Sequence, residues 1–266
     1  MMPSMVDATG SSERTADSRA LGVLRKPVIL RLASSIVASL ITGIVVGGLG
    51  GRLVMRLSAM AADDSRIGMT TDNGNVVGAI TGEGTLGLVL FVGLAVGLAM
   101  GPFLFALRAV LPGRRLPLTV SIVLLALGSA IVIDPGNPDF MIVGNRALNV
   151  AMFALLFPLF GFMSVALAEG FDRWLLQRPL VHLAPLTLIG TALGVGLGIL
   201  GIAVVAAQSG PPGSLAIVFV AVLGAVVTLT DGGVALGARE VALVALVIAT
   251  AWGLVNFAQD VGVIVG

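Results

Sequence analysis

The sequence contains no cysteine and no tyrosine, and its single histidine is His182. Without cysteine, the chain forms no disulfide, no thiolate metal site and no cysteine nucleophile. One histidine also falls short of the several ligands or the paired base that most zinc sites and histidine-based catalytic sites need. We therefore expect no metal, no cofactor and no catalytic residue, and these absences favour a protein that is not an enzyme.

Charged residues are also scarce. They make up 11% of the 266 residues, whereas about a quarter is usual in a soluble domain. So few charges cannot cover a water-exposed surface, and a net charge of +1 argues against bulk nucleic-acid binding. Lys26 is the only lysine among 15 Lys and Arg residues. Together with the many Ala, Gly and Val residues, this indicates GC-rich coding, and we expect a bacterial protein.

Apolar residues dominate what is present. They form 57% of the chain, and the mean hydropathy is +1.09. We expect an all-α fold, a polytopic transmembrane helical bundle of the bacterial cytoplasmic membrane. Residues 1–27 are predicted to be a disordered basic cytoplasmic tail and residues 28–266 the transmembrane domain. Seven spans are predicted, at about 32–51, 86–107, 116–133, 147–168, 183–207, 215–230 and 241–257. Six is the main alternative, because the last two are short for a bilayer.

The distribution of Arg and Lys predicts the orientation. With the N-terminus inside, the cytoplasmic segments hold eleven of them: Arg14, Arg19, Arg25, Lys26, Arg31, Arg108, Arg114, Arg115, Arg173, Arg178 and Arg239. The outer segments hold four: Arg52, Arg56, Arg66 and Arg146. Because cytoplasmic loops carry an excess of basic residues, this bias predicts a cytoplasmic N-terminus and, with seven spans, a C-terminus outside.

Small residues recur every four positions in three of the predicted spans. The repeats are Ser35, Ser39, Gly43, Gly47 and Gly51, then Gly93, Gly97 and Gly101, and finally Gly190, Gly194 and Gly198. Helices in lipid associate through close van der Waals packing, which small side chains allow. We interpret the repeats as glycine-zipper helix-packing surfaces, with tight packing inside one chain as the first interpretation. A homodimer seam or a sliding interface is the alternative.

Ionisable residues are absent from the middle of every predicted span, which argues against a proton-coupled pump with a carboxylate relay. Polar residues collect instead in the predicted outer loops 61–85 and 134–146. The turn sequence Asp72-Asn73-Gly74-Asn75 makes a small β-hairpin plausible in the first of these loops.

Arg52 and Arg56 lie four residues apart at the outer end of the first span. One interpretation is interfacial anchoring, in which both pair with outer carboxylates or reach lipid phosphates. The candidate carboxylate partners are Asp63, Asp64, Asp134 and Asp139. The alternative is a site for an anion or a lipid headgroup, because guanidinium groups grip phosphate through two hydrogen bonds.

These observations favour a non-enzymatic membrane subunit or accessory protein that packs through its Gly-striped helices. A small-solute or lipid transporter or channel is the alternative, and a membrane enzyme acting on a lipid headgroup at the outer face is a second. The expected partners are the lipid bilayer and either a second copy of the chain or another membrane protein. No nucleic-acid partner is expected.

Overall fold

The computed structural model describes most of the chain between residues 28 and 176, all of it from residue 233 onward, and scattered residues in between. The described residues are 28–61, 68, 82–111, 113–137, 140, 145–176, 195–196, 199–200, 218–219, 221–222, 224, 226–228 and 233–266. Outside these residues lie the predicted tail 1–27, the turn of the predicted hairpin, most of the span predicted at 183–207 and half of that at 215–230.

All regular structure in the described residues is helical. Two long helices, Val28–Met60 and Gly82–Val110, each change their winding along their length. The first contains η1 (Gly43–Gly50) and α2 (Gly51–Met60), and the second contains α3 (Gly82–Gly87), η3 (Leu88–Val96) and α4 (Gly97–Val110). Both η1 and η3 are π-helical. The remaining elements are the 3-10 turn η4 (Gly113–Arg115) and the helices α5 (Leu116–Val132), α7 (Arg146–Leu176) and α10 (Gly233–Val265).

Local sequence signals explain several of these boundaries. A proline stands in the first turn of α5, where its missing N–H costs nothing. After α5, the Asp134 carboxylate accepts a hydrogen bond of 2.8 Å from the Gly136 N–H and closes a turn. The side chain of Asn145 then caps α7 by accepting a bond of 3.0 Å from the Leu148 N–H.

Four of the described helices are long and apolar enough to cross a membrane: Val28–Met60, Gly82–Val110, Arg146–Trp174 and Ala235–Val265. An all-helical membrane protein is therefore supported. Each helix extends beyond its predicted apolar run, because a helix continues into the polar region outside the hydrocarbon core. The last span, predicted to be short, belongs to a helix of 33 residues. The fifth apolar helix, α5, has 17 residues, at the lower limit of about 17 for a crossing.

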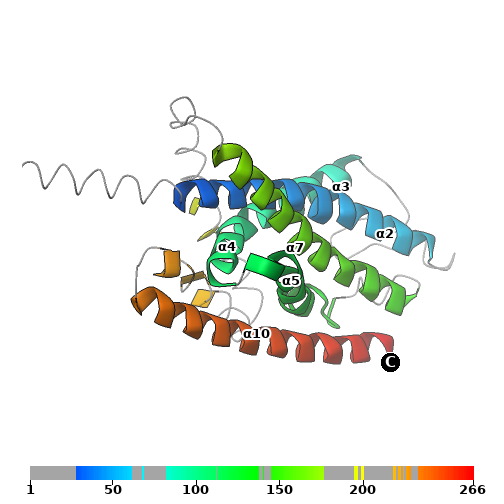
Figure 1. Cartoon of the computed structure of the whole chain (residues 1–266). Coiled ribbons are helices and arrows are strands. Elements are labelled where there is room, and N and C mark those ends of the chain that lie inside the picture. The colour runs from blue at the N-terminus through cyan, green and yellow to red at the C-terminus, as the bar shows by residue number, and fades with distance from the viewer. Residues whose placement is uncertain are drawn as a thin grey trace, which may run out of the picture.

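Figure 1 shows how the helices are arranged. The first long helix and α10 lie on opposite sides of the molecule, α4 and α5 lie between them, and α7 crosses the first long helix. The first and second long helices pack along η1 and η3, while α5 packs against both α7 and α10. The helix α5 is therefore packed between α7 and α10.

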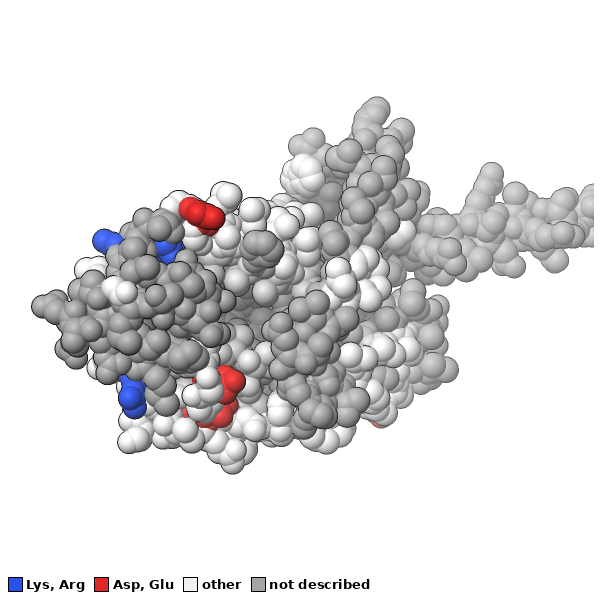
Figure 2. All heavy atoms as spheres, turned by 180° about the vertical axis from the view of Figure 1, so that it is seen from behind, with Lys and Arg blue, Asp and Glu red and all other residues white. Residues whose placement is uncertain are grey.

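The interior of the described bundle is apolar. Leu104, Leu107, Val120 and Val165 have at most 1% of their surface exposed. At one end, Phe140 and Phe153 add an edge-to-face contact with ring centroids 5.5 Å apart. On the face shown in Figure 2, the middle of the described surface is uncharged and most charged side chains gather toward one end. This distribution suits a protein whose surroundings are hydrocarbon in the middle and water at the ends.

Side-chain contacts define which helix ends share each side of the bundle. At the side that we call the Arg108 end, Arg108 of α4 pairs with Asp172 near the end of α7. At the same end, the Nε of Arg239, early in α10, donates to the Val110 carbonyl. At the opposite side, the Arg146 end, Arg146 Nη1 donates to the carbonyl of Ile264. Thus α7 ends, and α10 begins, on the same side.

Candidate functional site

The small residues of the first two long helices face one another. A Cβ on Gly43 would lie 2.2 Å from the carbonyl oxygen of Gly93 and 2.6 Å from the Cα of Gly97. A Cβ on Gly97 would lie 2.8 Å from the carbonyl oxygen of Ser39. Because carbon atoms prefer separations of about 3.5–4.0 Å, the two backbones touch where no larger residue fits. We call this contact, made by Ser39, Gly43, Gly93 and Gly97, the glycine seam.

The outer half of the first stripe fits less closely. A Cβ on Gly47 would meet its nearest atoms at 3.9 Å, which is ordinary contact, and one on Gly51 would lie 3.5 Å from Leu88. Gly48 makes the closer approach, 3.0 Å from the Cα of Val89. Toward the other end, a Cβ on Gly101 would lie 2.9 Å from the Cα of Ile36. Ser35 is also buried, and its hydroxyl turns to polar partners described below.

Glycine contacts outside the predicted stripes join the other helices. Gly161 of α7 lies against the backbone of Ser121, and Gly253 of α10 lies against the backbone of Ala126. Both Ser121 and Ala126 belong to α5, so single glycines bring α5 close to both neighbours. These glycines belong to no repeat of four residues, so the sequence pattern did not predict their contacts. The third predicted stripe, Gly190, Gly194 and Gly198, lies outside the described residues.

Arg52 and Arg56 lie one turn apart on α2, at the Arg146 end. Arg56 is exposed, and Arg52 is partly buried. The Nη2 atom of Arg52 is buried and has no hydrogen-bond partner. Within the described part of the chain, the one ion pair is between Arg108 and Asp172. Neither outer arginine is thus paired with a described carboxylate.

The predicted carboxylate partners divide into two groups. Asp134 is exposed, and its Oδ1 accepts the Gly136 N–H in the turn after α5. Its role in the structure is therefore to close that turn. Asp63, Asp64 and Asp139 lie outside the described residues, so their pairing with Arg52 or Arg56 stays a prediction.

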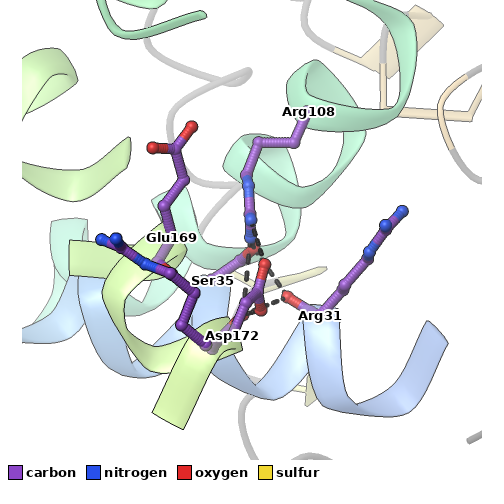
Figure 3. Close-up of polar contacts among 7 residues, drawn as sticks. Arg31, Ser35, Arg108, Glu169 and Asp172 are labelled. Carbon is purple, nitrogen blue, oxygen red and sulfur yellow. Dashed lines mark hydrogen bonds and ion pairs between the residues drawn. The ribbon is translucent and has the colours of Figure 1, made fainter. Parts of the chain in front are cut away.

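A polar cluster that the sequence did not predict lies at the Arg108 end. Figure 3 shows Arg108 of α4 and Asp172 of α7 meeting beside Ser35 of the first long helix. Arg108 Nη2 bonds to Asp172 Oδ2, and the two side chains are 11% and 18% exposed. Arg108 Nη1 also donates to Ser35 Oγ at 2.9 Å. We call Ser34, Ser35, Arg108 and Asp172 the polar clamp, because they join three helices.

The serines complete the hydrogen bonding of the clamp. Ser35 Oγ donates to the carbonyl oxygen of Arg31 at 2.8 Å while it accepts from Arg108. Ser34 Oγ lies 2.5 Å from Asp172 Oδ1 and 2.9 Å from the same carbonyl, so its single proton serves one acceptor at a time. The guanidinium of Arg31 points away from the cluster (Figure 3), and this residue contributes through its backbone.

The clamp is the largest concentration of paired charge in the described residues. A nearly buried pair of this kind is costly to form, yet removal of one partner leaves an uncompensated charge. The sequence contained a weak signal for it, because Ser34, Ser35, Arg108 and Asp172 all stand at the cytoplasmic ends of predicted spans. Sequence alone does not reveal which of these ends are neighbours.

Beside the clamp, Glu169, Asp172 and Arg173 line an open hollow of about 380 Å³. Glu169 directs its carboxylate away from Asp172 (Figure 3), and Arg173 Nε donates to the Glu169 carbonyl. The described residues that line the hollow therefore do not form a pair of nucleophile and base. The chain matches no protein-family model, and neither a curated protein nor a solved structure is similar enough to match it.

Proposed function

We propose that this chain is a non-enzymatic integral membrane protein, a membrane subunit or accessory protein that packs with a second copy or with a partner in the bilayer. The supporting observation is the distribution of its side chains. The described interior is mainly Leu, Val, Phe and Ala with a few buried Ser and Thr hydroxyls, whereas the paired charges lie at the Arg108 end. A carrier needs a polar path through the middle, and the charged residues that the structure describes all stand near helix ends instead.

The arrangement of helix ends supports a topology for this function. We propose that the Arg108 end faces the cytoplasm, as the basic residues predict. The end of α7 and the beginning of α10 both lie at the Arg108 end, which supports an even number of crossings in the chain between them. The two spans predicted at 183–207 and 215–230 meet this condition and bring the total to seven.

Solvent access to the middle of the bundle tests the proposal. Thr42 lies in the middle of the first long helix, and Ser129 lies in the last turn of α5. Both are fully buried and neither hydroxyl has a hydrogen-bond partner, so a water-filled transport path along these helices would expose them. The chain has no cysteine, and Thr42→Cys or Ser129→Cys therefore introduces the only thiol. We expect neither variant to react with a charged, water-soluble thiol reagent in native membranes.

The exposed position Asp134 provides the control, since Asp134→Cys should react readily in the same membranes. After denaturation, all three variants should react equally. Rapid labelling of Thr42→Cys or Ser129→Cys in the native state would instead indicate a water-filled path and support a carrier.

Counting subunits by single-molecule photobleaching tests the packing role. A lone monomer without a co-purifying chain would contradict that role.

A further inference from the structure

The guanidinium of Arg52 lacks a counter-charge within the described protein. It is partly buried, and its Nη2 atom is buried without an acceptor. Partial burial removes water from a charge, and this is unfavourable unless another group compensates it. An external anion can supply that compensation through the more accessible nitrogens.

The amino end of α7 adds positive potential beside α2. Ser58, near the end of α2, donates a hydrogen bond of 2.8 Å to Asn149 in the first turn of α7. The amino end of this helix of 31 residues therefore lies beside α2, and a helix amino terminus carries a partial positive charge. Three described carboxylates stand near the same end, Glu83, Asp134 and Asp260, and none of them bonds to Arg52 or Arg56.

The depth of the two arginines identifies the source of the anion. Residues 32–51 of the first long helix carry no charge, and this run is long enough to cross a hydrocarbon core of about 30 Å. Arg52 is the first residue after the run, and Arg56 is one turn further out. Both therefore lie at the level of lipid headgroups, where phosphodiester groups are the most abundant anions.

We propose that Arg52 and Arg56 bind the phosphodiester group of an anionic phospholipid at the Arg146 end. Arginine presents its donors as a planar fork that matches two phosphate oxygens. The partly buried Arg52 holds the phosphate against the protein, and the exposed Arg56 closes over it from the bilayer surface. This site is independent of the packing function proposed above.

Native mass spectrometry of the full chain, titrated with phosphatidylglycerol or phosphatidylcholine, tests the site. The wild-type protein should retain phosphatidylglycerol preferentially. Arg52→Gln and Arg56→Gln should each weaken this binding about tenfold, the loss expected for one charge-assisted contact. Arg52→Lys should bind with intermediate affinity, because lysine keeps the charge without the fork.

Arg31→Gln is the matched control, since it removes one exposed arginine from the opposite end of the same helix. It should leave the binding of phosphatidylglycerol unchanged. Equal binding by the wild type, Arg52→Gln and Arg56→Gln would overturn the proposal. Displacement of the lipid by inorganic phosphate would overturn the lipid source in favour of a free anion. If Arg52→Gln does not fold, the exposed Arg56 and the variant Arg52→Lys still decide the outcome.

Discussion

At the scale of single residues, the Arg108–Asp172 pair connects three helices. The two side chains are mostly buried, so each depends on the other for charge compensation. Ser34 and Ser35 supply the remaining hydrogen bonds from a third helix. The strength of the clamp therefore depends on all three helices being in place at once.

We expect Asp172→Asn to destabilise the protein by about 3 kcal/mol, because it leaves the Arg108 guanidinium nearly buried without a carboxylate. Glu169→Gln, which removes a carboxylate one turn earlier on α7 without breaking a described ion pair, should have little effect. Thermal unfolding of the purified proteins in one detergent compares them. The double variant Arg108→Gln, Asp172→Asn should cost less than the two single costs added together, and full additivity would contradict coupling in the clamp.

At the scale of elements, the two π-helical segments explain how a repeat of four residues stays in contact. Four residues of an α-helix exceed one turn, so such a repeat drifts by about 40° per step and by about 160° from Ser35 to Gly51. A π-helix, with its i→i+5 hydrogen bonds, needs more than four residues per turn. Within η1 the position of every fourth residue therefore drifts around the helix in the opposite direction. This keeps Gly43, at the start of η1, and Gly51, just after its end, on the buried side.

Substitution of two glycines in this stripe tests the close approach of the helices. Gly43→Ala should destabilise the protein by about 1–3 kcal/mol, the usual cost of overpacking, because its Cβ would lie 2.2 Å from the Gly93 carbonyl oxygen. Gly47→Ala is the matched control, since its Cβ finds ordinary contacts at 3.9 Å. Thermal unfolding measures both variants. Equal melting temperatures would contradict a contact made at Gly43.

At the scale of the whole molecule, the helix ends constrain the topology. Contacts at the Arg108 end join the first long helix, the end of α4 and the end of α7 to one another, and they join the end of α4 to the start of α10. The contact between Arg146 and the Ile264 carbonyl places the end of α10 on the opposite side. The first long helix therefore begins at the Arg108 end, and α10 ends at the Arg146 end. If each of these helices and α5 crosses the membrane once, a chain that begins and ends on opposite sides has an odd number of spans.

Labelling of introduced cysteines tests this topology in intact cells. We expect Gly82→Cys and Asp134→Cys, which are exposed at the Arg146 end, to react with a membrane-impermeant maleimide from outside. Arg173→Cys and Glu240→Cys, which are exposed at the Arg108 end, should react only after permeabilisation. If Arg173→Cys and Glu240→Cys reacted from different sides, an odd number of crossings would separate α7 from α10, as six spans require.

The amino-acid sequence by itself determined that the protein is helical and built for a membrane, and where most of the described apolar helices lie. Hydrophobicity and length are properties of one segment, so they can be predicted from the sequence without knowledge of the segment's neighbours. Tertiary structure decided that Gly43 meets Gly93, that Gly161 and Gly253 approach α5, and that Arg108 meets Asp172. Such contacts depend on which helix ends are adjacent, because an ion pair or a close approach needs two surfaces that only packing brings together.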